Sequence, residues 1–168
     1  EERDRLLQVT KLSSPQLHLA VVLSLATGAR QSEIWGLRWQ EIDLKDGFLK
    51  FEHTKNGDIR VVPVIGEVLD LLRGYHSQHR IVGRDELFPS RTKGKSLDLR
   101  TQWESALKQA EIEDFRWHDL RRSAISNMFQ IRNYDLPTVQ LLSGHKQPSV
   151  LLKVYTKLDP EQVARKLG

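Results

Sequence analysis

The sequence contains no cysteine. Disulfide frameworks, thiolate metal sites, zinc fingers and cysteine nucleophiles are therefore excluded. Long hydrophobic runs are absent too: the longest, residues 19–26, is far shorter than the roughly 20 apolar residues that cross a bilayer. The charged start, EERDR, is unlike a signal peptide. From these absences we expect a soluble protein of a reducing compartment.

The positive charge of the chain is concentrated near its end. The 168 residues fit one domain that is large enough to bury a hydrophobic core. Residues 1–115 carry 17 basic against 18 acidic side chains, whereas residues 116–168 carry 9 against 4. A local basic excess is typical of a phosphate-binding surface, although many proteins that never contact nucleic acid also have one.

Helix signals occur along most of the chain. Ser14 and Pro15 suit a helix start and Gly28 suits a left-handed end, which predicts a helix over 15–26. Ser32 is expected to cap a second helix. Glu33 lies in the first turn of this helix, whose apolar residues continue as far as Trp39. Apolar periodicity and start or stop residues predict further helices at about 66–75, 97–110, 120–131 and 137–144, one ending near Tyr155, and one from Pro160.

Strand signals are fewer. Residues 47–64 contain two strand-like runs around Asn56-Gly57, a dipeptide typical of a type I′ hairpin turn. A third strand is expected near residues 86–89, and PSRTKGKS (89–96) is predicted to be an exposed basic loop. Because the clear pairing is antiparallel and helices outnumber strands, the sequence predicts an α+β fold, a mostly helical domain with a small antiparallel sheet of about three strands.

The stretch RWHDLRRSAIS (116–126) contains the first candidate site residues. His118 and Arg121 lie three residues apart on a predicted helix and therefore face the same way. A guanidinium group is planar, bidentate and permanently charged, which suits phosphate oxygens. A structural alternative is that His118 caps the helix while Arg121 pairs with Asp119 or Glu33. This fragment by itself favours the structural alternative, because such ion pairs are common.

Five separate motifs change that balance. They are LSLATGARQSEIWGLRWQEID (23–43), TKNGDIRVVPV (54–64), HDLRRSAIS (118–126), LLSGHK (141–146) and KVYTKL (153–158). In this order and spacing, over residues 13–160, they resemble the catalytic domain of the tyrosine recombinase, or phage integrase, family. The resemblance implies a site-specific recombinase of a bacteriophage or mobile element that forms a 3′-phosphotyrosyl intermediate with DNA and releases a 5′-hydroxyl. Since the bond energy is kept, it implies no ATP, no metal and no other cofactor.

The resemblance also assigns the nucleophile and the phosphate clamp. Tyr155 matches the family's nucleophile, although by composition Tyr75 or Tyr134 would be equally good. Arg30 and Arg121 match the two arginines that hold the scissile phosphate. The alternative for Arg30 is a cation that interacts with a helix dipole. The interval between the Gly-His motif and Tyr155 is one residue longer than is usual in the family.

Further roles are implied for residues around this clamp. Lys55 matches the general-acid lysine that protonates the departing 5′ oxygen. His118 would move or orient a proton, and His145 would donate a hydrogen bond to the phosphate. Glu33 would orient Arg30 or its neighbours, or would only stabilise the first turn of its helix. Candidate contacts to the DNA backbone are Arg122, Lys93, Lys95, Lys146, Lys153 and Lys157.

The implied partner is double-stranded DNA that carries attachment or recombination sites. We expect a core-site-binding domain upstream, a tetramer on DNA, a monomer or weak dimer for the isolated domain, and a cytoplasmic, nucleoid-associated location in a prokaryotic or phage-infected cell, with no membrane partner. One alternative is a DNA-binding or assembly module that has lost cleavage; the complete set of site residues argues against it. Another is a metal-dependent phosphodiesterase using His118 and Asp119, which the lack of other clustered acidic ligands disfavours.

Overall fold

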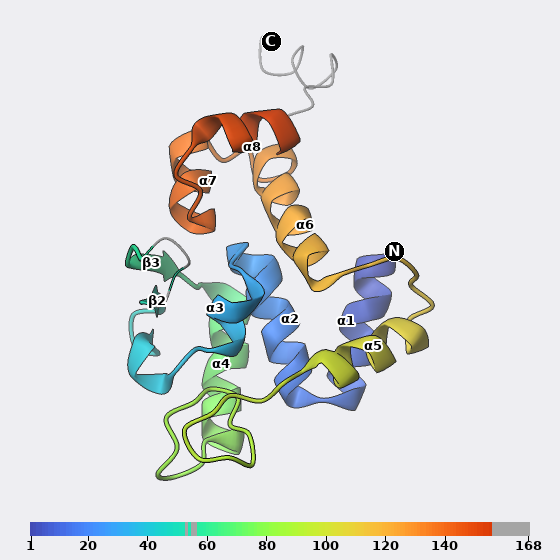
Figure 1. Cartoon of the computed structure of the whole chain (residues 1–168), viewed down its shortest axis with the longest axis vertical. Coiled ribbons are helices and arrows are strands. Elements are labelled where there is room, and N and C mark those ends of the chain that lie inside the picture. The colour runs from blue at the N-terminus through green and yellow to red at the C-terminus, as the bar shows by residue number, and fades with distance from the viewer. Residues whose placement is uncertain (53, 55–56, 156–168) are drawn as a thin grey trace.

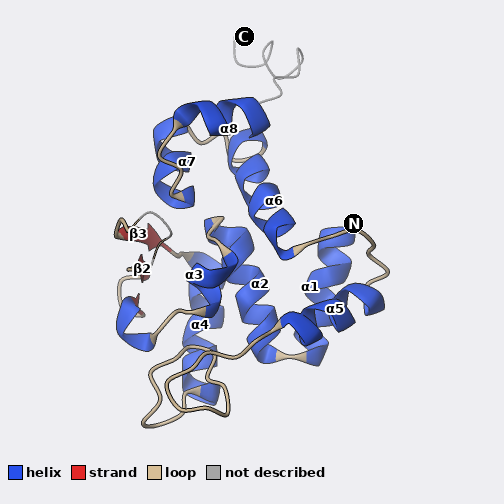
Figure 2. Ribbon diagram, viewed as in Figure 1, coloured by secondary structure: helices blue, strands red, loops and turns tan. Residues whose placement is uncertain are grey.

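The computed structural model describes residues 1–52, 54 and 57–155; for residues 153–155 it describes the backbone alone. This part of the chain forms eight helices and one small sheet (Figures 1 and 2). The helices are α1 (Glu2–Ser13), α2 (Pro15–Thr27), α3 (Gln31–Trp35), α4 (Gly66–His79), α5 (Arg100–Gln109), α6 (Trp117–Gln130), α7 (Leu136–Ser143) and α8 (Pro148–Tyr155). A short 3-10 helix, η1 (Trp39–Glu41), precedes the strands β1 (Ile42–Asp43), β2 (Phe48–Phe51) and β3 (Arg60–Pro63). None of the described helices is both long and apolar enough to cross a membrane.

Helix α2 lies at the centre and packs against α1, α3, α4 and α6 (Figure 1). It starts where predicted, since the Ser14 hydroxyl accepts a hydrogen bond from the Leu17 N–H at 3.2 Å. It ends where Gly28 takes a left-handed conformation, with φ of 68°. Because α2 contacts neighbours on several sides, its apolar residues occur around most of its circumference.

The three strands form an antiparallel sheet in the order β1-β2-β3, which confirms the predicted α+β class. The position predicted for the third strand was wrong. Glu86 makes only an isolated bridge to Arg38, while the Leu87 N–H donates to the Leu37 carbonyl. Residues 86–88 are buried beside the core, and Pro89 lacks the N–H that a longer strand would need.

The predicted hairpin exists between β2 and β3. Pairing between β2 and β3 ends at Phe51 and Arg60, so residues 52–59 connect the strands. The Gly57 N–H donates to the Thr54 carbonyl at 3.0 Å. The Thr54 hydroxyl donates to the Asp58 carbonyl at 2.6 Å, a local bond that competes with the strand ladder. Asn56 lies outside the described residues.

Three helix predictions need correction. Helix α3 starts at Gln31 rather than after a Ser32 cap, because the Glu33 carboxylate accepts the Arg30 N–H at 2.8 Å, and α3 ends at Trp35. Ile131 is exposed rather than part of the buried stripe, because α6 ends one residue earlier. Helix α1 was not predicted, since only two of its residues are buried.

The remaining predicted helices within the described residues are present, with bounds that differ by a few residues. The helices expected at 66–75, 97–110, 137–144 and near Tyr155 correspond to α4, which continues to His79, and to α5, α7 and α8. Residues 91–95 are exposed, and the Arg84 guanidinium holds their loop by donating to the Ser90 carbonyl at 2.9 Å. The helix expected from Pro160 lies outside the described residues.

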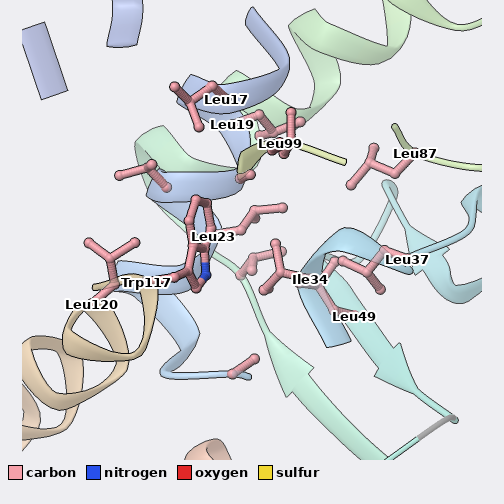
Figure 3. Packing of buried hydrophobic residues seen from close by; sticks show 14 of the residues in the cluster. Leu17, Leu19, Leu23, Ile34, Leu37, Leu49, Leu87, Leu99, Trp117 and Leu120 are labelled. Carbon is pink, nitrogen blue, oxygen red and sulfur yellow. The ribbon is translucent and has the colours of Figure 1, made fainter. Parts of the chain in front are cut away.

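The core connects the elements that carry the candidate site residues. Figure 3 shows Leu23 of α2 close to Trp117 and Leu120 at the start of α6. The Trp117 ring also lies edge-on to Trp35 at 5.1 Å and to Trp103 at 4.8 Å, measured between ring centroids. Packing against α3 and α5 therefore fixes the first turn of α6 and, one turn later, Arg121.

We expect Leu23→Ala to destabilise the protein by about 2–5 kcal/mol, because Leu23 is fully buried and its loss leaves a cavity. Urea-induced unfolding followed by circular dichroism would measure this change. The matched control is Leu12→Ala on α1, whose side chain is exposed and whose substitution should change stability by less than about 0.5 kcal/mol. Equal effects of the two substitutions would contradict this description of the core.

Candidate active site

Arg121 is a buried cation held by the carboxy-terminal ends of two helices. Only 3% of its surface is exposed. Its Nη1 atom donates to the Gly28 carbonyl of α2 at 2.6 Å and to the Ser143 carbonyl of α7 at 2.7 Å. The last carbonyls of a helix have no partner within the helix and carry partial negative charge, so they stabilise a cation.

This geometry overturns the structural alternative for the RWHDLRR stretch. The Asp119 carboxylate does not pair with Arg121; it accepts the Arg116 N–H at 2.7 Å and so caps α6. Glu33 pairs with Arg60 instead. His118 is not the cap, because Arg116 occupies the N-cap position. Carbonyl dipoles at two helix ends stabilise the Arg121 guanidinium, whose positive charge is permanent.

His145 leaves α7 directly after Gly144, whose φ of 77° turns the chain back, as predicted. The Arg121 Nη2 atom donates to His145 Nδ1 at 3.1 Å. Nη2 also lies 3.4 Å from Nε2. Because guanidinium cannot accept a hydrogen bond, we assign the lone pair to Nδ1, the nearer ring nitrogen, and the ring proton to Nε2. The Ser143 hydroxyl, 2.8 Å from Nδ1, can donate to that lone pair.

Burial, which has the largest effect, and the nearby cations Arg121, Arg30 and Arg60 together lower the pKa of His145 to about 4. At neutral pH the ring is therefore uncharged. The pKa of His118 is also lowered, first by burial and then by Arg121. His118 lies one helical turn before Arg121 and is exposed on the surface of α6.

Glu33 connects two further arginines. Its side chain is 1% exposed, and its carboxylate accepts Arg60 Nη1 at 2.9 Å and Nη2 at 3.2 Å. The same carboxylate accepts the backbone N–H of Arg30, while the Arg30 Nη1 atom lies 3.9 Å away. Arg30 is the N-cap residue of α3, so its position follows from the short turn after Gly28.

Sequence reasoning missed Arg60, although it lies inside one of the five motifs. Its side chain is 8% exposed and is directed inward from β3. A signal was present, because residues two apart in a strand share a face and Val62 is an obvious core residue. An open cavity of about 330 Å³ lies beside Arg60, which lines it together with Arg30, Gly144, His145 and residues of the hairpin.

The predicted nucleophile and general acid are only partly within the described chain. Helix α8 contains Tyr155, whose backbone alone is described, and α8 packs against α6 and α7. Lys55 lies outside the described residues. Tyr75 is a poor alternative nucleophile: it is buried, its hydroxyl donates to the Leu87 carbonyl at 3.2 Å, and burial raises its pKa to about 12. Tyr134 is half-buried, and its hydroxyl accepts Arg132 Nη1 at 3.4 Å.

The predicted DNA contacts fall into separate regions. Arg122 is exposed on α6, and Lys146 follows His145 and pairs with Asp58 of the hairpin at 2.7 Å. Lys93 and Lys95 lie in the exposed loop below α4, at the opposite end of the molecule from α7 (Figure 1). For Lys153 only the backbone is described, and Lys157 lies outside the described residues.

Across the described ranges, His, Asp and Glu side chains do not gather in groups of three or more that could hold a metal ion. Asp119, the partner of His118 in the phosphodiesterase alternative, already uses its carboxylate to cap α6. The fold brings four of the predicted residues together: Arg30 and Glu33 at the start of α3, Arg121 of α6, and His145 just after α7. Such an arrangement of fixed cations and a neutral hydrogen-bond donor suits a phosphoryl group.

Comparisons with known proteins identify the family. A sequence model of the phage integrase family matches residues 1–162. The shufflon-specific DNA recombinase of Escherichia coli is 32% identical over 99% of this chain. The chain therefore belongs to the phage integrase family. It spans 41% of the length of that recombinase.

Solved structures of tyrosine recombinase catalytic domains share the fold. The catalytic domain of bacteriophage HP1 integrase matches with a TM-score of 0.72 and 24% identity, over 99% of this chain and 89% of that one. XerH site-specific recombinase, in a post-cleavage complex with its palindromic difH substrate, matches with a TM-score of 0.77 and 22% identity, over 99% of this chain and 50% of that one. At these identities the likeness concerns the fold.

We expect the His145 ring to titrate with a midpoint near pH 4, measured by histidine ring NMR. Because this folded pKa lies below the usual 6.5, the unfolded state binds the proton more readily, so the folded state loses stability as the pH falls from 6.5 toward 4. Thermal unfolding at about pH 7 and about pH 5 would measure the loss.

The control for this titration is His145→Gln, which keeps a polar group and removes the titration. It should lose less stability between the two pH values than the unchanged protein. His18 and His118, whose pKa values burial also lowers, stay in both proteins and contribute equally. A His145 midpoint at or above 6.5 would contradict the buried, arginine-lined environment.

Proposed function

We propose that this chain is the catalytic domain of a site-specific DNA recombinase or integrase that cleaves and rejoins DNA through Tyr155. The single observation that carries the proposal is the convergence of Arg30, Arg121 and His145 at one end of the central helix. Membership of the phage integrase family supports it, as does the named activity of the E. coli relative, a DNA recombinase. The DNA-bound XerH structure supports double-stranded DNA as the partner.

In the proposed reaction the Tyr155 oxygen attacks a DNA phosphorus atom and the bond from phosphorus to the 5′ oxygen breaks. The tyrosine loses its proton and the departing 5′ oxygen gains one, so the proton count balances. Lys55 is the proposed donor to that oxygen, and His118 is proposed to assist proton movement at the tyrosine. Reversal of the step on a partner strand rejoins the DNA without ATP or metal.

The described geometry supports a division of work at the phosphate. The guanidinium groups of Arg30 and Arg121 would stabilise negative charge on the non-bridging oxygens. Neutral His145 would donate its Nε2–H to one of those oxygens. Arg121 is well suited to this role, because two helix ends fix it before DNA arrives and little reorganisation is then needed.

Exposed basic residues would add affinity through the DNA backbone. Arg122, Lys146 and Lys153 are proposed to contact phosphates near the site, while Lys93 and Lys95 would require a second contact region because of their distant loop. Contacts of this kind do not read sequence and weaken as salt is added. We further propose that the active assembly on DNA is a tetramer and that the isolated domain is a monomer or weak dimer.

Covalent trapping tests this function. The protein in its full natural length is incubated, in EDTA, with nicked DNA that spans its element's junction, and any DNA-linked peptide is mapped by mass spectrometry. We expect a phosphotyrosyl linkage at Tyr155, because a nick lets the cleaved strand diffuse away before rejoining. Tyr155→Phe should abolish the adduct, since it removes the attacking oxygen.

The matched control is Tyr134→Phe, which removes a tyrosine hydroxyl elsewhere and should leave the adduct intact. Linkage at Tyr134 or Tyr75 would show that the nucleophile is misassigned. Tight DNA binding with no adduct would favour the non-catalytic module. Loss of cleavage in EDTA and its return with a divalent cation would contradict the metal-independent mechanism.

A further inference from the structure

Arg60 is enclosed by three parts of the site. Its guanidinium contacts the Glu33 carboxylate of α3 and lies 4.8 Å from the centre of the Phe51 ring on β2. It also packs against Gly144, so closely that a Cβ atom on this glycine would collide with the guanidinium. One side chain thus contacts both the helix that positions Arg30 and the turn that positions His145.

The charges around Glu33 explain how the Arg60 contact affects Arg30. A carboxylate that is 1% exposed needs a cation, and both Arg30 and Arg60 are near. Arg60 occupies both carboxylate oxygens at hydrogen-bond distance, whereas the Arg30 guanidinium remains 3.9 Å away. Within the described chain the Arg30 guanidinium forms no hydrogen bond, and its side chain is 26% exposed toward the cavity.

We propose that Arg60 is a positioning residue that saturates Glu33, keeps the Arg30 guanidinium available for the scissile phosphate, and supports the Gly144–His145 turn. This inference rests on the proposed function. Arg60 acts through Glu33 and Gly144 rather than on the phosphate. If Arg60 is removed, the nearest remaining partner for the buried carboxylate is Arg30, and closing that 3.9 Å gap withdraws Arg30 from DNA.

Arg60→Met tests the proposal, because it keeps much of the side chain's volume and removes its charge. In the full natural chain, we expect the single-turnover rate constant of adduct formation at saturating nicked DNA to fall roughly 10²-fold, as for loss of one transition-state donor. DNA affinity, measured by fluorescence anisotropy, should change by less than about threefold, because it is spread over many phosphate contacts.

The double variant Glu33→Gln with Arg60→Met separates charge from packing. Glutamine keeps an oxygen that accepts the Arg30 N–H but no longer attracts the Arg30 guanidinium. The double variant should therefore form the adduct at least about tenfold faster than Arg60→Met alone, a coupling typical of residues in direct contact. A double variant no faster than the single one would overturn the proposal.

A matched control uses another arginine that pairs with a carboxylate. Arg100 donates to both oxygens of Asp98 on the exposed surface at the start of α5. Arg100→Met should leave the rate constant and the affinity unchanged. An Arg60→Met protein that cleaves at the unchanged rate would overturn the proposal. If Arg60→Met is unfolded at the assay temperature, Arg60→Gln, which also removes the charge, must show the same fall in rate without loss of affinity; equal losses in both would also overturn the proposal.

NMR of the arginine side chains gives a readout that needs no activity. In Arg60→Met, the Nε–H signal of Arg30, assigned with Arg30→Lys, should shift and exchange more slowly with water as Arg30 pairs with Glu33. An unchanged Arg30 signal would contradict the proposal. If the unsubstituted protein forms no adduct, the proposed function fails, and the NMR signal of Arg30 still tests the role of Arg60. If the unsubstituted protein forms an adduct and Arg60→Met forms it at the same rate, only the inference about Arg60 fails.

Discussion

The site depends on holding one permanent positive charge inside the protein. Arg121 cannot lose its proton, so oxygen atoms must surround it wherever it is buried. The carbonyls of Gly28 and Ser143 supply those oxygens because two helices end there with glycines in the left-handed conformation. Helices α2 and α7 are thereby joined through the side chain of α6, and His145 is placed on the far side of the same guanidinium.

Arg60 is buried in the opposite way, against a carboxylate. Glu33 forms two hydrogen bonds with it, so the pair is close to neutral and contributes little attraction for an anion. The two buried arginines therefore have different surroundings: helix-end carbonyls hold Arg121, and a carboxylate holds Arg60. His145 remains uncharged beside these cations, so its ring adds no electrostatic repulsion between the positive groups of the site.

The fold brings these groups together from segments that are far apart in the sequence. Trp117 packs between α3 and α5 and sets the start of α6, and α7 then returns toward β3 and the hairpin. The likeness to HP1 integrase and XerH, at sequence identities below one quarter, agrees with a scaffold defined by packing rather than by surface residues. The extra residue before Tyr155 falls in or beside the turn between α7 and α8, since α8 starts at Pro148.

The sequence by itself determined the α+β class, the helices with clear start and stop residues, and the family, because capping residues, apolar periodicity and motif order are local properties. It could name Arg30, Arg121, His145 and Glu33, but not their partners. Tertiary structure decided that Arg121 binds carbonyls, that Asp119 caps α6, and that Arg60 belongs to the site. These choices depend on which oxygens approach each buried charge after packing, and residues far apart in the chain supply those oxygens.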